Sequence, residues 1–205
     1  MVLRIDEENP DERRIKQVVE CLNDGGVIIY PTDTVYTLGC DITHKSAYKK
    51  ICDLKGVKPN KANFSIVCHD LSHISDFTLN LPTPTYKMMK SMLPGPYTFI
   101  LRSNKNVQKI FGYKKMEVGI RVPNHNIPRT IVKTLGNPIL SASIKKDDEI
   151  LEYVTDPQEL EYLYEGIVDI VIDGGAGKNI PSTVINHVDS EPFLVREGLG
   201  EVEVE

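Results

Sequence analysis

The chain has 205 residues, of which 40% are hydrophobic, and a formal net charge of -5 at pH 7; these values predict one globular domain, residues 1–205, with a core of its own. No apolar run reaches the roughly 20 residues that cross a bilayer, and the N-terminus, MVLRIDEENPDERR, is charged where a secretory signal is apolar, so we expect a cytoplasmic protein with no membrane partner. The four cysteines form no C-x-x-C pair, which argues against a disulfide framework or a zinc site.

The first predicted helix follows Asn9-Pro10, which has the pattern of an N-cap and a proline at the first helical position. Apolar residues then recur at the helical spacing i, i+3, i+4, i+7, and Gly25-Gly26 ends the helix. Those residues are Ile15, Val18, Val19 and Leu22. The next predicted elements are a buried strand over 27–30, a helix over 45–54 closed by Gly56, and a strand over 64–68.

The second half of the chain continues to alternate between the two kinds of element. The predicted helices cover 84–93, 128–135 and 157–164, and the predicted strands cover 97–101, 118–122, 138–143 and 167–173, followed by a hairpin over 182–188 and 193–198. Helices are interleaved with strands, but hairpin returns are present too. This order predicts an α/β (α+β) domain with a mixed sheet, and not a doubly wound parallel sheet.

One short segment stands out after the first predicted strand. YPTDTVYTLGCDI, residues 30–42, carries three threonines, two aspartates and two tyrosines. A loop in solvent has no need of this density of hydroxyl and aromatic groups, and a core strand is expected to avoid it. We therefore interpret the segment as part of a binding site.

Three familiar motifs fail when they are tested against the sequence. DGGAGKN at 173–179 lacks both the first glycine and the final Ser or Thr of a phosphate-binding loop. Ser141 and Ser143 have no G-x-S-x-G elbow around them, which argues against a serine hydrolase. The five histidines form no H-E-x-x-H pattern, so we predict no dedicated metal site.

The charges are unevenly distributed along the chain. Residues 45–146 contain 18 of the 24 Lys and Arg residues but only four of the 29 Asp and Glu residues, a net charge of +14, and the flanking segments carry -19. One interpretation is scattered, solvated charge. The other is an electropositive surface that binds phosphates or nucleic acid.

Polar residues gather near the ends of several predicted elements, and each has a structural alternative. The hydroxyls of Thr32 and Thr34 could bond to the backbone in a turn, and the lysines of LKGVKPNK at 54–61 could be a solvated helix end. Arg121 lies inside an apolar strand and needs a partner, which could be a structural carboxylate or a ligand.

Seven motifs follow one another between about residue 15 and residue 198: YPTDTVYTLG, LKGVKPNK, LPGPYTF, IRVP, SAS, PSTV and REG. Together they resemble the motifs of the YrdC/YciO-like superfamily of threonylcarbamoyl-AMP synthases. The family motif Y-P-T-[DE]-T-x-Y-G-L-G is similar to YPTDTVYTLG, and L-K-x-R-P-x-x-K to LKGVKPNK. The other matches are LPGPYTF, IRVP, SAS (for S-x-N), PSTV and REG. The resemblance implies a single-domain YrdC/RibB-like fold, in which a twisted mixed β-sheet with flanking helices surrounds a deep, positively charged cavity.

The resemblance also implies a reaction and its residues. Members join L-threonine, bicarbonate and ATP into threonylcarbamoyl-adenylate, which is used to modify an adenosine of tRNA. By this resemblance the catalytic residues are Lys55, Lys58 and Arg121. The substrate-binding residues are Thr32, Tyr36, Lys61, Ser141, Ser143, Ser182 and Arg196. Cations would stabilise the charge of the leaving pyrophosphate, arginine would bind a carboxylate, and Mg²⁺ would be required only together with ATP.

Three departures from the family motifs fall within this expected site. K-x-R-P is one residue longer here and has Lys58 in place of arginine, the asparagine of S-x-N is Ser143, and Thr37 replaces a glycine. They indicate the YciO branch of the family. Two alternatives to the synthase therefore stay open: a protein that binds double-stranded RNA or tRNA without making the adenylate, and a hydrolase of the threonylcarbamoyl group.

Overall fold

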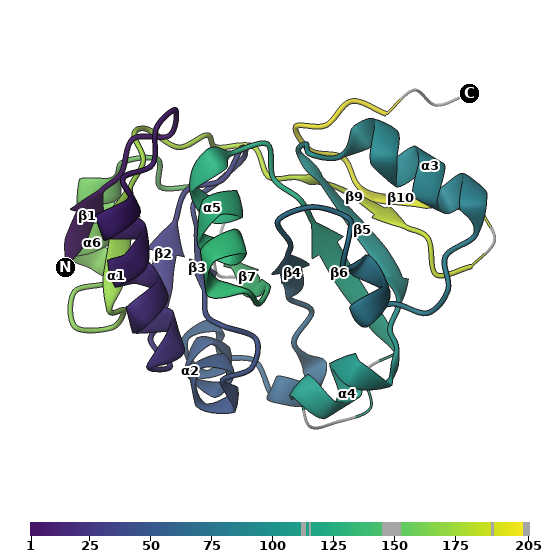
Figure 1. Cartoon of the computed structure of the whole chain (residues 1–205), viewed down its shortest axis with the longest axis horizontal. Coiled ribbons are helices and arrows are strands. Elements are labelled where there is room, and N and C mark those ends of the chain that lie inside the picture. Colours follow the sequence, from purple (N-terminus) through teal and green to yellow (C-terminus); the bar gives the residue numbers. More distant parts are fainter. Residues whose placement is uncertain (112–113, 115, 145–152, 190, 203–205) are drawn as a thin grey trace.

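The computed structural model describes residues 1–111, 114, 116–144, 153–189 and 191–202, and within them ten strands form one sheet (Figure 1). The strand order is β1-β8-β2-β3-β7-β4-β6-β5-β9-β10. The strands are β1 (Val2–Arg4), β2 (Ile28–Tyr30), β3 (Thr37–Gly39), β4 (Ser65–Val67), β5 (Tyr97–Arg102), β6 (Glu117–Arg121), β7 (Ile139–Ser143), β8 (Ile170–Asp173), β9 (Thr183–Asn186) and β10 (Phe193–Arg196).

The sheet is mixed, as the sequence predicts. Four neighbouring pairs are parallel, namely β1 with β8, β2 with β8, β4 with β6 and β5 with β9. The other five pairs are antiparallel, including the predicted closing hairpin of β9 and β10. Because both kinds of pairing occur in one sheet, the interleaved helices do not produce a doubly wound parallel arrangement.

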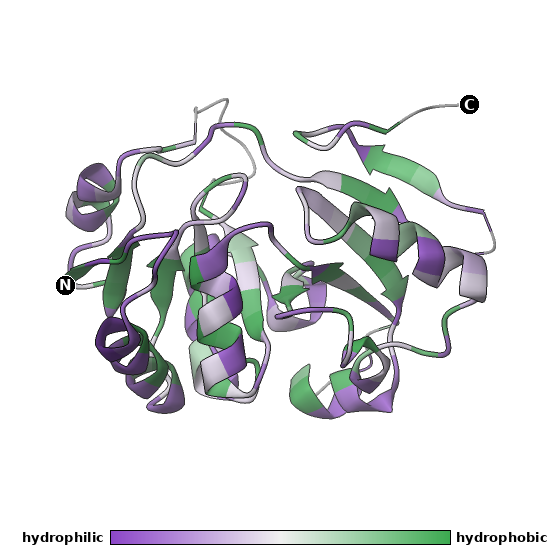
Figure 2. Cartoon of the chain, turned by 45° about the horizontal axis from the view of Figure 1, so that its top comes forward, coloured by the Kyte–Doolittle hydropathy of each residue, from purple (hydrophilic) through white to green (hydrophobic). Residues whose placement is uncertain are grey.

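The helices enclose the sheet on both sides and along its lower edge in the view of Figure 1. They are α1 (Glu12–Asn23), α2 (Lys45–Lys55), α3 (Thr83–Met92), α4 (Lys105–Phe111), α5 (Asn126–Leu135) and α6 (Pro157–Leu163), with two 3-10 helices, η1 (Pro59–Lys61) and η2 (Ile74–Asp76). Colouring by hydropathy shows apolar strands behind helices whose outer faces are polar (Figure 2).

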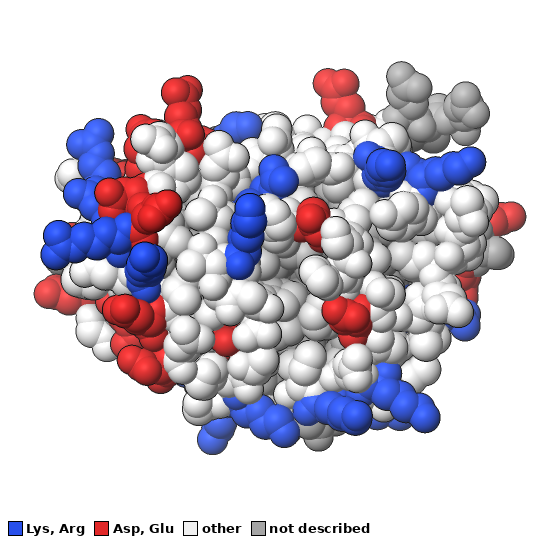
Figure 3. Space-filling model, viewed as in Figure 1, with Lys and Arg blue, Asp and Glu red and all other residues white. Residues whose placement is uncertain are grey.

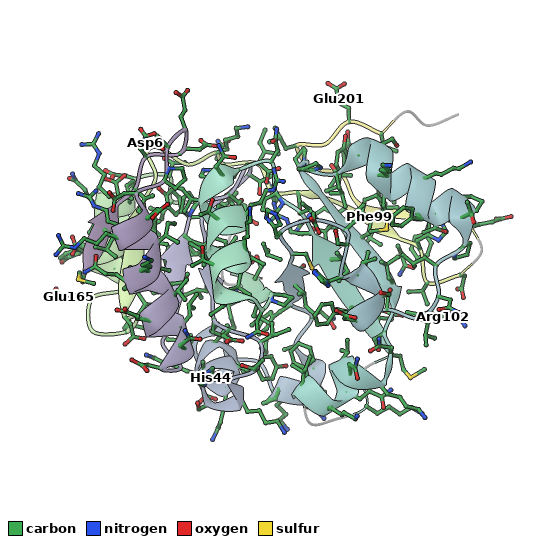
Figure 4. All side chains as sticks on the ribbon, viewed as in Figure 1. Asp6, His44, Phe99, Arg102, Glu165 and Glu201 are labelled. Atoms are coloured by element: carbon green, nitrogen blue, oxygen red, sulfur yellow. The ribbon has the colours of Figure 1, made fainter. Side chains whose placement is uncertain are left out.

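Two apolar clusters stabilise the two sides of the sheet. In the first, α1 and α5 cover Ile28 and Tyr30 of β2 and Ile172 of β8, and the predicted apolar stripe of α1 is fully or nearly fully buried. The second contains residues of α2, α3 and α4 and the other side of the strands, among them Phe99. Figure 4 places Phe99 within the fold on β5 and Arg102 at the periphery, where the same strand ends.

Two predicted helix starts are wrong. Helix α1 begins at Glu12 and not after Asn9, because the carboxylate of Asp11 accepts a hydrogen bond from the backbone N–H of Arg14 at 2.9 Å and serves as the N-cap. Helix α5 begins at Asn126, before the predicted residue 128, because Nδ1 of His125 accepts from the backbone N–H of Ile127. In both cases a polar side chain next to the predicted start satisfies the first free N–H groups.

The polar segment 30–42 is entirely buried, and Thr37–Gly39 in it forms strand β3. The expectation that a core strand would avoid such residues is therefore wrong. Strands β1 and β3 and helix α4 were not predicted, because three-residue strands and a seven-residue helix are too short for a periodic pattern to be recognised. The strand predicted over 167–173 begins only at Ile170.

The four cysteines are free; Cys40, Cys52 and Cys68 are buried and Cys21 is partly exposed. In the part of the chain that the structure describes, no helix is long and apolar enough to cross a membrane.

Candidate functional site

A cavity of about 510 Å³ lies over one face of the central strands, and we term it the central cavity. Its lining includes a set of hydroxyl side chains that come from strands or from residues next to them. These are Thr37, Ser65, Thr98, Ser141, Ser143 and Ser182. A cavity of this volume is within the usual range for a small-molecule site.

The strand register explains why these hydroxyls share one face. Ser65 of β4 is paired with Ser141 of β7 on one side and with Gly119 of β6 on the other. Successive side chains of a strand point to opposite faces, and the intervening residues, such as Leu140 and Ile66, lie in the apolar core. Gly119 has no side chain to crowd the Ser65 hydroxyl on this face, because a Cβ atom at residue 119 would lie 2.9 Å from Oγ of Ser65.

Four cationic side chains from four different elements line the same cavity: Lys55 at the end of α2, Lys61 in η1, Arg121 in β6 and Arg196 in β10. Among the described lining residues, Glu117 is the only carboxylate. Elsewhere in the described ranges, no group of three or more His, Cys, Asp or Glu residues could hold a metal ion. The composition of the lining therefore favours an anionic ligand.

Arg121 is held by a buried ion pair. Its Nη2 donates to Oδ1 of Asp33 and to Oγ1 of Thr34, each at 3.0 Å, and the two charged side chains are only 5% and 8% exposed. The second oxygen of Asp33 accepts from the backbone N–H of Asn124 at 2.9 Å. A structural carboxylate is therefore one partner of Arg121, while Nε of its guanidinium has no hydrogen-bond partner among the residues that the structure describes.

Arg196 is anchored to the turn before β9. Its Nη2 and Nε donate to the carbonyl oxygen of Ser182 at 2.8 and 3.2 Å, and the hydroxyl of Ser182 lies 2.8 Å from that of Thr98. Partial burial lowers the pKa of Arg196, Tyr153 opposes this, and the nearby charge of Arg121 lowers the pKa further. The positive charges of the two guanidinium groups therefore repel each other, and a bound anion would offset this repulsion.

The structure brings seven of the ten predicted site residues into the central cavity: Lys55, Lys61, Arg121, Ser141, Ser143, Ser182 and Arg196. It does not bring Lys58, Thr32 or Tyr36 there. Lys58 is exposed and precedes η1 as its N-cap residue. Tyr36 is 1% exposed, and its hydroxyl donates to the carbonyl of Gly175 at 2.6 Å and accepts from the N–H of Gly174 at 3.2 Å, so it joins two segments of the backbone.

Thr32 belongs to a second pocket of about 240 Å³, which we term the outer pocket. Its hydroxyl donates to the carbonyl of Val35 and accepts from the N–H of Thr34, which is the turn alternative considered above. Asp33 also lines the outer pocket, whereas Arg121 lines the central cavity. The Asp33–Arg121 ion pair therefore forms part of the wall between the two.

The outer pocket contains a buried histidine that gives the protein a predicted acid sensitivity. Burial, together with Lys178, lowers the pKa of His125 to about 4, from an ordinary value near 6.5. Below pH ~6.5 the unfolded chain therefore binds more protons at this site than the folded one, and stability is lost as the pH falls towards 4. We expect urea unfolding to show a loss of about 1–2 kcal/mol from this residue between pH 7 and pH 5.

The matched variant is His125→Asn, because asparagine can still cap α5 but does not titrate in this range. Its free energy of unfolding should fall less than that of the wild type between the same two pH values. An equal fall in both proteins would show that His125 is not the source.

Several site residues were missed at the sequence level. Ser65 lies in β4 and Thr98 in β5, and both line the central cavity. Because side chains alternate between the two faces of a strand, both residues could have been assigned to the cavity face once the strands had been located. Asp33, the partner of Arg121, lies 88 residues away in sequence, and no local pattern reports that contact.

Comparisons with known proteins identify the family of this chain. The family model Sua5_yciO_yrdC, described as "Telomere recombination", matches residues 20–198. The chain belongs to this family. It is 40% identical to the uncharacterized protein YciO of Escherichia coli K12 over 197 residues, which cover 95% of this chain and 94% of that one.

Some of the other similar proteins are longer than this chain, and others have nearly the same length. The threonylcarbamoyl-AMP synthase of Bacillus subtilis 168 is 29% identical over 195 residues, 94% of this chain but 56% of that one. Among solved structures, that of E. coli YciO matches with a TM-score of 0.90 and 37% identity, covering 99% and 98% of the two chains. Sua5 of P. abyssi, solved with L-threonine, matches in fold with a TM-score of 0.86 and 24% identity, over 97% of this chain and 57% of that one.

Proposed function

We propose that this family member binds ATP and L-threonine in the central cavity and joins them with bicarbonate into threonylcarbamoyl-adenylate, for the modification of tRNA in the cytoplasm. The observation that carries the proposal is the convergence of four cations, from α2, η1, β6 and β10, on one hydroxyl-lined cavity. The 29% identity to a named synthase supports it. The chain is also 40% identical to YciO, which is described as uncharacterized, so the reaction itself has to be tested by experiment.

The chain's own residues would act mainly by position and charge. Lys55 and Lys61 would stabilise the triphosphate as negative charge develops on the leaving pyrophosphate. Arg196 would present its planar guanidinium to phosphate or base, and the hydroxyls of Ser141 and Ser182 would orient the reactants. Among the described lining residues only Glu117 is a carboxylate. Mg²⁺ would therefore be held chiefly by the phosphates and enter as part of the substrate.

Lys55→Ala tests the proposal directly. With L-threonine, bicarbonate and radiolabelled ATP, the wild type should form pyrophosphate and adenylate, and the variant should lose at least about tenfold in rate, because one charge-stabilising interaction is removed from the transition state. Lys87→Ala is the control, since Lys87 is exposed on α3, outside the described lining of the cavity. The synthase proposal fails if the wild type makes no more product than Lys55→Ala.

RNA binding without synthesis is the second candidate. Exposed lysines gather along the lower edge of the molecule over α2 and α4 (Figure 3). They include Lys45, Lys49, Lys50, Lys105 and Lys109, and Lys61 extends the set to the cavity. Three other basic residues of the same stretch, Lys115, Lys145 and Lys146, lie outside the described residues.

Salt dependence distinguishes this second candidate. If the lysines contact phosphates, retention of double-stranded RNA or tRNA should fall steeply as salt rises, because each neutralised phosphate releases a counterion. Retention that is absent, or that does not respond to salt, would count against an RNA surface.

A further inference from the structure

Strand β10 forms one end of the sheet, and no described strand lies on its outer side (Figure 1). Its inner side pairs with β9, and all four of its residues are exposed. The strand at the other end, β1, is mostly covered and has one exposed residue. The N–H and C=O groups on the outer side of an edge strand have no ladder partner and can pair with another chain. Strand β10 is therefore the edge of this sheet that is open to strand addition.

Three consecutive apolar side chains of β10 are exposed to solvent. Phe193, Leu194 and Val195 are 55%, 44% and 51% exposed. Natural edge strands are commonly protected from pairing by charges, a proline or a bulge. Here Pro192 precedes the strand and a bulge lies between Leu194 and Arg196, so the free edge is short. A short apolar edge of this kind indicates a surface that binds a short extended segment.

Carboxylates lie at both ends of this edge. Glu191 precedes the strand and Glu197 follows it; both are exposed, and neither has an ion pair with another described residue. The guanidinium of Arg196 donates to the carbonyl oxygen of Ser182, and the lysines of α3 lie on a helix in front of the sheet (Figure 1). Opposite charges at opposed positions stabilise a strand pair. The two ends therefore favour a strand with lysine or arginine at the matching positions.

A second copy of this chain is a poor partner for the same edge. Antiparallel self-pairing centred on Leu194 would place Glu191 of each copy opposite Glu197 of the other. Like charges in directly opposed positions destabilise a strand pair. The two carboxylates therefore oppose pairing between copies and favour a basic strand from a different protein.

We propose that β10 binds an extended segment of another protein, in which alternating apolar residues lie between lysine or arginine residues, and that this segment adds to the sheet as a further strand. Main-chain hydrogen bonds would provide the affinity, and the charges at the two ends would select the partner. Val195 and Arg196 also line the central cavity, so the added strand would lie beside the cavity wall. The proposal does not rest on the proposed function, because the surface is complete without a ligand in the cavity.

Fluorescence anisotropy with the whole chain and three labelled peptides tests the surface. The first peptide alternates valine with threonine and has lysines at both ends. The second has the same core between glutamates, and the third has lysine ends with proline in place of valine, so that it cannot form a strand ladder. We expect the first peptide to bind saturably and the second about tenfold more weakly, because favourable charge pairs become repulsive. The third should not bind.

Two double variants locate the binding on β10. Phe193→Ser with Leu194→Ser removes apolar side chains from the edge and should weaken binding of the lysine-ended peptide about tenfold. Glu191→Lys with Glu197→Lys reverses the charges at the two ends and should make the glutamate-ended peptide the stronger ligand. Both double variants should fold, because all four side chains are exposed.

A matched control is Glu159→Lys with Glu165→Lys. Both residues are exposed carboxylates in or just after α6, and Glu165 lies at the opposite end of the molecule from β10 (Figure 4). The net charge changes by the same amount as in the variant of Glu191 and Glu197, but the preference for the lysine-ended peptide should remain. A reversed preference in this control would mean that net charge alone selects the peptide, and the proposal would be wrong.

Other outcomes also contradict the proposal. If the lysine-ended peptide does not bind, or if the glutamate-ended or proline peptide binds equally well, the edge does not select a basic strand. If the wild type sediments as a dimer that Phe193→Ser with Leu194→Ser converts to a monomer, a second copy occupies β10. The anisotropy measurement uses no nucleotide, so it can succeed or fail independently of the adenylate assay.

Discussion

Asp33→Ala is expected to lower the free energy of unfolding by about 3–5 kcal/mol, because it leaves the charge of Arg121 buried without its carboxylate partner. The pair is 3.0 Å long and almost fully buried, and the same carboxylate accepts the backbone N–H of Asn124. Equilibrium unfolding in urea measures the loss. Because the wall between the central cavity and the outer pocket depends on this pair, binding of ligands in the central cavity should be lost with it.

Asp189→Ala is the control for this prediction. Asp189 pairs with Arg102 at the same distance, 3.0 Å, but the two side chains are 58% and 75% exposed, and an exposed ion pair contributes at most about 1 kcal/mol. A similar small loss for Asp33→Ala would mean that water reaches Arg121 and that the pair is not part of a dry wall.

Gly198→Ala is expected to disable the central cavity. A Cβ atom at this position would lie 2.4 Å from the carbonyl oxygen of Pro181 and 2.5 Å from the carbonyl carbon of Ser182, and backbone atoms cannot move aside as a flexible side chain would. The turn that holds Ser182 must shift, and Arg196, which donates to it, must shift as well. We expect a loss of about 1–3 kcal/mol in stability and, if the synthase proposal is correct, a fall in rate on the order of 100-fold from misplaced groups.

Glu197→Ala tests whether the effect is specific to the glycine. Glu197 precedes Gly198 in the chain, and it is exposed and outside the described lining of the cavity. Its stability and adenylate rate should stay near the wild-type values. A wild-type rate for Gly198→Ala would show that the close approach of the two segments is relieved without moving Arg196.

The predicted elements that were long and periodic are confirmed, and the errors lie at their ends and in the short pieces. The stripe of apolar residues in α1 and the capping glycine after α2 are visible in the sequence, because each reports a local property of the backbone or of one helix face. The start of α1 depends on whether Asp11 or Asn9 caps it, and both are good capping residues. Strand β3 contains too few residues to show alternation.

Local sequence patterns are limited in the same way for the candidate site, because they name residues but not their contacts. Seven of its residues could be named because the family motifs resemble segments of this chain, and the structure places those seven in one cavity. Thr32 and Tyr36 come from the most recognisable of these motifs, yet their hydroxyls bond to the backbone of their own turn or of the segment at Gly174 and Gly175. A motif identifies residues that a family keeps, and it does not say whether a residue faces the ligand or supports the residues that do.

The amino-acid sequence by itself determined the class of fold, the family, the reduced cysteines and the set of cations available to a site. These follow from composition, periodicity and motifs, which are properties of neighbouring residues. Only the tertiary structure decided that Arg121 is paired with Asp33, that Thr37 is the register partner of Ser143, and that cations from four elements line one cavity. Each of these contacts joins strands or loops that are distant in sequence, and strand register, which local sequence does not encode, brings their side chains together.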